Sequence, residues 1–140
     1  MTDQLVEMTD SDCAELLLFW GNIPGVGLSD ADTLPGLSSY LDRNPGLSFV
    51  VRHEGKIVGA VLCGHEGRRG YLHHLAVAAE HRRQGIGKTL VEQCLSKLGA
   101  LGIQKCNIFV YCDNHDGSGF WQRSGWLDRS DLKVMQRPIA

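Results

Sequence analysis

The feature that most constrains the fold is an amphipathic segment over residues 88–101, which predicts the clearest helix in the chain. Its apolar side chains recur on one helical face: Val91, Cys94, Leu95, Leu98 and Leu101. Apolar, β-branched runs predict a strand on either side, at Tyr71–Val77 and at Ile108–Cys112, the second one buried on both faces. A helix between two such strands indicates helices packed on a sheet.

The rest of the chain adds helices and strands to this centre. The further predicted elements, in order, are a strand around Leu5–Met8, a helix to about Trp20, a helix over Leu34–Leu41, a hairpin of Ser48–Arg52 with Lys56–Cys63, a helix over Ser118–Arg123 and a last strand at Leu132–Gln136. The expected fold is α/β (α+β), a mixed β-sheet flanked by helices in the order β-α-α-β-β-β-α-β-α-β. Its 140 residues fit one domain, 1–140.

Composition limits the classes of partner. The net charge of −2 gives no reason to expect nucleic acid or a membrane surface. The longest apolar run, Leu16–Trp20, is too short to span a bilayer, and the acidic N-terminus lacks the basic start of a signal peptide, so we expect a cytoplasmic protein. The five cysteines include no Cys-x-x-Cys pair, and we predict no metal.

A loop at Arg82–Lys88 lies between the end of a predicted strand and the start of the clearest helix. Backbone N–H groups at a helix N-terminus lack intrahelical partners and favour a phosphate, and Gly85 and Gly87 let its oxygens approach. The loop matches neither the Walker pattern nor the dinucleotide fingerprint. The alternative is a glycine-bearing turn that merely starts a helix.

The run Leu75–Gly87, LAVAAEHRRQGIG, resembles the acetyl-CoA motif of the GNAT superfamily of N-acetyltransferases, Arg/Gln-x-x-Gly-x-Gly/Ala after a Leu-x-Val strand. Residues 114–126, from Asn114 through Phe120-Trp121 to Gly125-Trp126, are similar to that family's Asn-x-x-Ala-x-x-Phe-Tyr-x-Lys-x-Gly-Phe. The resemblance implies a transferase (acyltransferase) that uses acetyl-CoA. It also implies a twisted sheet splayed between the strands 70–77 and 106–112, with acetyl-CoA in the cleft.

The resemblance assigns cofactor contacts by position. It implies that the main chain of Leu75 and Val77 pairs with the pantetheine arm, that residues 83–88 wrap the pyrophosphate, and that Asn114 binds the arm. For Asn114 alone, a plain turn former is the alternative. The implied cofactor residues are Leu75, Ala76, Val77, Arg82, Arg83, Gln84, Gly85, Ile86, Gly87, Lys88, Asn114 and Trp121.

The family's usual acid and base are both replaced. Trp121 stands where many members have a tyrosine that protonates the thiolate, and Phe109 stands where some have a glutamate base. Tyr111 and Tyr71 are the substitute acids. His73 is the favoured base, because the family enzyme that acetylates serotonin resembles this strand, with histidines at the places of Tyr71 and His73. Strand alternation puts His73 on one face with Tyr71 and Leu75, and His74 on the other. The alternative for His73 is a structural role.

The predicted reaction is acetyl transfer to a primary amine of a small molecule, an amino acid or a peptide. Trp20 and Tyr40 fall where the family binds its acceptor, although core packing explains these aromatics equally well. Two other functions stay open: an acyl-CoA-binding sensor or interaction module with little catalysis, and a protein N-terminal or lysine acetyltransferase. A homodimer also stays open.

Overall fold

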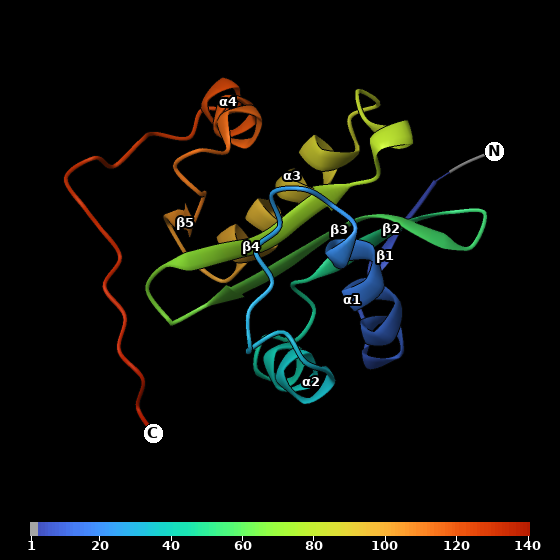
Figure 1. Ribbon diagram of the computed structural model, residues 1–140, viewed down its shortest axis with the longest axis horizontal. Helices are drawn as coiled ribbons and strands as arrows, with labels where there is room; N and C mark the ends of the chain where they lie inside the picture. Colours follow the sequence, from blue (N-terminus) through green and yellow to red (C-terminus); the bar gives the residue numbers. More distant parts are fainter. Residues whose placement is uncertain (1–2) are drawn as a thin grey trace. The chain divides into compact units, whose positions relative to one another are not determined.

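A computed structural model describes residues 3–140, and these residues form two compact units, one that ends at Phe109 and one of Val110–Ala140 (Figure 1). The elements of the first unit are β1 (Gln4–Glu7), η1 (Asp10–Asp12), α1 (Cys13–Gly21), α2 (Leu34–Arg43), β2 (Phe49–His53), β3 (Lys56–His65), β4 (Gly70–Val77), η2 (Ala79–His81), α3 (Ile86–Ala100) and β5 (Cys106–Ile108). The second unit holds α4 (His115–Arg123). Within the described chain, no helix is both long and apolar enough to cross a membrane.

The sheet has five strands in the order β1-β2-β3-β4-β5. The first four are antiparallel neighbours, and β5 joins β4 in parallel. The long central strand β3 is buried over almost its whole length, as expected for a strand with neighbours on both edges and helices on both faces. The predicted mixed sheet flanked by helices is therefore confirmed.

Helices cover the two faces of this sheet. A Cβ atom at Gly59 of β3 would meet Ile86 and Leu90 of α3, whereas one at Gly64 would meet Tyr40 of α2. Alternate side chains along a strand point to opposite faces, so α3 covers one face and α2 the other. The helix α1 packs with α2 around one apolar cluster: Met8, Cys13, Leu16, Trp20, Leu37, Val50, Ile57, Ala60, Leu62 and Ala76.

Polar contacts fix the two N-terminal helices. The Oγ1 atom of Thr33 accepts the N–H of Gly36 at 3.1 Å and so caps α2. The guanidinium of Arg52 in β2 donates to Asp12 at 2.6 Å and to Glu15 at 3.0 Å. These ion pairs tie the start of α1 to the sheet, and the Thr33 cap fixes where α2 begins.

One predicted strand is absent and another was predicted too long. The segment Leu132–Gln136 is not a strand, because its backbone pairs with no other strand in the described chain. The predicted strand Ile108–Cys112 ends in fact at Ile108. It is not buried on both faces, because its three residues are half-buried or exposed and the Phe109 side chain that follows is 64% exposed.

Candidate active site

A β-bulge lies in the middle of β4. Ala76 pairs with Ala60 and His73 pairs with Leu62, so two residues, His74 and Leu75, stand opposite one residue of β3. His74 adopts a left-handed backbone with φ of 56°, which is uncommon for a residue with a side chain. The bulge breaks the simple alternation of side chains along the strand.

The bulge brings both histidines to the face that α1 and α2 cover. The His73 ring lies 6.2 Å from the Tyr40 ring of α2, and the His74 ring lies 5.1 Å from the Trp20 ring of α1. The prediction that His74 points away from the face of His73 was therefore wrong. The prediction assumed that side chains alternate regularly along the strand, and the sequence gives no sign of the residue that the bulge adds.

The sheet opens at His73. The strand β4 pairs with β5 only from Gly70 to Leu72, and on that side the rest of β4 has no neighbouring strand within residues 3–109. Just after β4, the N–H of Ala78 donates to the carbonyl oxygen of Val58 in β3 at 2.8 Å. Because successive residues of a strand direct their N–H and C=O groups to opposite edges, those groups of Val77 point toward the open edge. The Val77 carbonyl oxygen accepts the Nε of Arg82 at 3.2 Å. This edge of β4 is therefore unpaired beyond Leu72, and because β5 ends at Ile108 the predicted splay of the two strands stays a prediction.

Aromatic rings surround the His73 imidazole. The Tyr71 ring is parallel to it at 6.4 Å, and the Phe109 ring lies 6.0 Å away. Burial lowers the pKa of His73 below its ordinary value of 6.5, and the neighbouring charge of His74 lowers it further, while Asp32 opposes this. The imidazole is consequently neutral at pH 7 and can accept a proton.

His74 holds the loop between α1 and α2. Its Nε2 lies 2.9 Å from Oδ1 of Asp32, and both side chains are largely buried. The other carboxylate oxygen of Asp32 accepts the N–H of Ser29 at 2.7 Å. Sequence reasoning missed Asp32, because nothing in its loop marks it as the partner of a residue 42 positions away.

Two polar atoms in the same layer lack hydrogen-bond partners. The indole N–H of Trp20 and the hydroxyl of Tyr40 are buried and bond to no group of the described chain. Burial also raises the pKa of Tyr40, so its hydroxyl stays protonated and can donate. Buried donors of this kind are costly unless a ligand or water satisfies them.

The loop before α3 has the features of an anion site. Gly85 precedes the helix with φ of 81° and provides no side-chain cap, and the first helical bond runs from Thr89 N–H to the Gly85 carbonyl at 2.9 Å. The N–H groups of the first turn, which begins at Ile86 rather than the predicted Lys88, are therefore available. Ile86 is buried, which anchors the turn, while Arg82, Arg83, Gln84 and Lys88 are exposed.

The second unit contains the Asn-aromatic motif. The Oδ1 atom of Asn114 accepts the Gly117 N–H at 3.0 Å and caps α4. A Cβ atom at Gly117 would lie 2.6 Å from the Asn114 amide nitrogen, so an alanine here would require the Asn114 side chain to shift. The Trp121 ring packs at 5.0 Å from Trp126. Asn114 is thus the predicted turn former, and its Nδ2 donors are not used in the cap.

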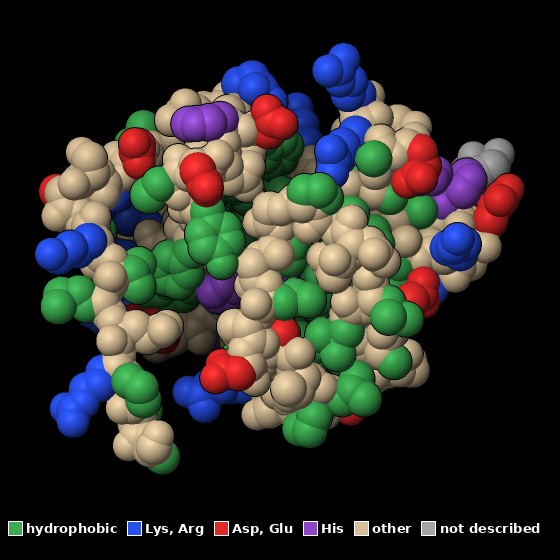
Figure 2. Space-filling view, in the orientation of Figure 1, with side chains coloured by type: hydrophobic (Ala, Val, Ile, Leu, Met, Phe, Trp, Pro, Cys, Tyr) green, Lys and Arg blue, Asp and Glu red, His purple; other side chains and the backbone are tan. Residues whose placement is uncertain are grey.

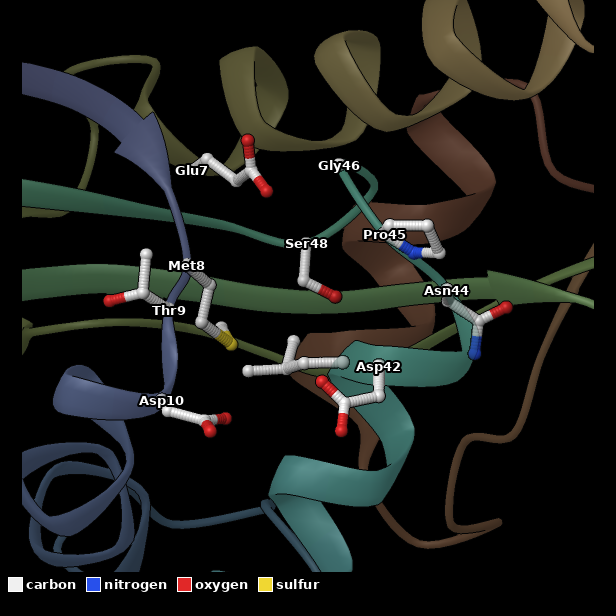
Figure 3. Close-up of a pocket in the computed structure, with 10 residues that line it drawn as sticks. Glu7, Met8, Thr9, Asp10, Asp42, Asn44, Pro45, Gly46 and Ser48 are labelled. Atoms are coloured by element: carbon white, nitrogen blue, oxygen red, sulfur yellow. The ribbon is translucent and has the colours of Figure 1, made fainter.

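One hollow lies apart from these residues, beside the C-terminal end of α2. Its volume is about 290 Å³, and its lining, shown in Figure 3, consists of Glu7, Met8, Thr9, Asp10, Leu41, Asp42, Asn44, Pro45, Gly46 and Ser48. None of the predicted site residues lines it. Its three carboxylates would repel the phosphates of coenzyme A, so this hollow is not the predicted donor site.

Comparison with known proteins agrees with this geometry. The model of the acetyltransferase (GNAT) family matches residues 16–126. The chain is 29% identical to an acetyltransferase of Yersinia enterocolitica over 130 residues, 93% of this chain and 92% of the relative. The chain belongs to the acetyltransferase (GNAT) family. It is accordingly an acyltransferase, as the two sequence motifs predict.

Solved structures share the fold. The PaiA N-acetyltransferase of Thermoplasma acidophilum, in complex with coenzyme A, has a TM-score of 0.77 at 17% identity, with 89% of each chain covered. The AAC(6')-Iy structure, in complex with the bisubstrate analogue CoA-S-monomethyl-acetylneamine, has a TM-score of 0.75 at 14% identity, with 100% of each chain covered. These likenesses confirm the predicted fold class.

Proposed function

We propose that this acetyltransferase moves an acetyl group from acetyl-CoA to a primary amine of a small molecule, an amino acid or a peptide. The observation that carries the proposal is the position of His73. It is the first residue of β4 beyond the pairing with β5, and its side chain faces the layer of α1 and α2. A neutral imidazole at the point where the sheet opens is suited to take a proton from an amine.

The donor fits the open edge and the start of α3. The uncapped first turn, with Gly85, Gly87 and the exposed Arg82, Arg83, Gln84 and Lys88 around it, supplies N–H groups and positive charge for a pyrophosphate. The main chain of Leu75, Ala76 and Val77 would receive the pantetheine arm. For Asn114 and Trp121, the proposed contacts with the donor rest on the sequence motif.

Each proposed role follows from a group on this chain. His73 would take the proton, directly or through a water, as the amine nitrogen bonds to the acetyl carbon and the carbon–sulfur bond breaks. The N–H of Val77 points toward the open edge and would donate to the carbonyl oxygen. Tyr71 would protonate the departing thiolate, because the indole N–H of Trp121 is too weak an acid; the alternative of Tyr111 rests on its position in the sequence alone.

The acceptor would enter from the layer of α1 and α2. There the unpartnered Trp20 N–H and Tyr40 hydroxyl offer donors, and the loop held by Asp32 borders the two histidines. One structural neighbour was solved with an analogue that joins coenzyme A to an acetylneamine, an amine acceptor. This supports a small amine as the acceptor of the present enzyme.

A panel experiment tests the proposal. Binding of coenzyme A is measured by calorimetry, and thiol release from acetyl-CoA is followed with amines, amino acids and peptides. We expect binding and turnover with at least one free amine. Binding without turnover on any acceptor would favour an acyl-CoA sensor, turnover on peptides alone would favour a protein acetyltransferase, and absence of binding would refute the donor assignment.

A further inference from the structure

Three potential metal ligands meet at one end of the sheet, apart from the candidate active site. Asp3 precedes β1, His53 ends β2 and His81 ends η2. One ligand atom from each of these side chains lies within 4.8 Å of the other two. Figure 1 shows the N-terminus, the β2–β3 turn and the segment after β4 at this end, and Figure 2 shows histidine side chains exposed there beside carboxylates.

The contacts within the cluster are already close. The Nδ1 atom of His53 lies 2.8 Å from Oδ1 of Asp3, and the His53 and His81 rings are 4.8 Å apart and tilted by 54°. A carboxylate oxygen of Glu54 lies 4.0 Å from Nε2 of His53. Among the described residues, no lysine or arginine forms an ion pair with Asp3, so no protein cation occupies the place of a metal.

The donor set is that of a transition-metal site. Two imidazoles and one carboxylate bind Zn²⁺ at about 2.0–2.2 Å, which separates tetrahedral ligand atoms by about 3.3 Å. Since the ligand atoms all lie within 4.8 Å of one another, no pair has to change its separation by more than roughly 1.5 Å, a distance that side-chain rotation provides. A fourth position remains for water.

We propose that Asp3, His53 and His81 form a binding site for a divalent transition metal, with Zn²⁺ as the reference ion. The three ligands come from three separate segments, so the ion joins the start of β1, the end of β2 and η2. His81 directly precedes Arg82, the first residue of the loop before α3. The bound ion consequently anchors the start of that loop, outside the donor site itself.

Calorimetric titration with ZnCl₂ tests the site on protein stripped with a chelator. The Cys112→Ser variant serves as the parent, because the exposed Cys112 thiol is itself a zinc ligand. We expect one equivalent to bind. Changes in groups that only orient metal ligands weaken affinity about 10–100-fold, so Asp3→Asn, His53→Gln and His81→Gln are each expected to weaken it at least tenfold.

The matched control is His115→Gln, which removes an exposed histidine outside the cluster and is expected to leave the affinity unchanged. Substitution of Co²⁺ gives a second readout, because the visible absorption of a tetrahedral site should appear in the parent and disappear in His81→Gln. Absence of Zn²⁺ binding by the parent, or equal affinity in the parent and all three cluster variants, would overturn the proposal. No acetyl-CoA is present, so this result is independent of the proposed reaction.

Discussion

The imidazole Nε2 of His74 lies 2.9 Å from the carboxylate of Asp32, and this pair joins the bulge of β4 to the loop between α1 and α2. His74 is the direct neighbour of His73, the proposed base. The bulge therefore puts His74, which fastens the loop, on the same face as the proposed base. A strand with regular alternation would have turned one of the two histidines toward α3.

Removal of the carboxylate should release the loop. Asp32→Ala leaves the buried His74 without its partner, and loss of a hydrogen bond to a charged group costs about 1.5–3 kcal/mol of unfolding free energy. We expect easier proteolysis within residues 22–33 and a higher KM for the amine, with the affinity for coenzyme A unchanged. Denaturant unfolding, limited proteolysis and initial rates measure the three effects.

The control for this change is Asp30→Ala, in the same loop. The Asp30 side chain is exposed and makes no hydrogen bond with another described residue. An equal effect of both substitutions would show that the loop responds to lost charge rather than to the lost contact with His74.

The glycine before α3 offers a test of the anion site. Gly85→Ala places a side chain at φ of 81°, which costs about 1–2 kcal/mol in the left-handed region, and adds a Cβ atom beside the available N–H groups. Displacing one phosphate contact worth about 1.5–3 kcal/mol should raise the Kd for coenzyme A about tenfold or more. Calorimetry measures this directly.

Gly102→Ala is the matched variant, because Gly102 has φ of 83° but follows the other end of α3. It should lose similar unfolding free energy while binding coenzyme A as the parent does. If both alanine variants lost the same affinity, the loss at Gly85 would come from backbone strain and not from a phosphate contact.

The lowered pKa of His73 predicts a pH dependence of stability. Its folded pKa lies below the ordinary value of 6.5, so as pH falls below 6.5 the unfolded chain binds a proton before the folded chain does. Unfolding free energy should therefore fall as pH drops through this range, and less so in His73→Gln. Denaturant curves at pH 7.5 and pH 5.5 give the difference, and equal acid sensitivity of both proteins would contradict it.

The sequence predicted most of the fold, because its signals are local. The amphipathic run of α3 defines a helical period, and the apolar, β-branched runs of β2 to β4 mark strands. The last strand at Leu132–Gln136 failed for a physical reason, since an apolar run becomes a strand only where a neighbour pairs with its backbone. Pairing is a property of the tertiary structure.

The candidate site also has parts that the sequence predicts and parts that it does not. The loop before α3 could be predicted from Gly85 and the arginines around it, because the chemistry of a helix start is local. The bulge at His74, its bond to Asp32 and the meeting of Asp3 with His81 join residues that lie far apart in the sequence. No spacing rule connects such residues, so only the folded chain brings them together.

The central claim is that His73 takes the proton of the acceptor amine, and steady-state kinetics of His73→Gln with an amine found in the acceptor panel tests it most directly. General acid–base catalysis contributes about 10²–10⁴-fold, so kcat/KM should fall by at least about 100-fold while the Kd for coenzyme A stays unchanged. Retention of kcat/KM within a few fold of the parent would contradict the claim and leave His73 a structural residue.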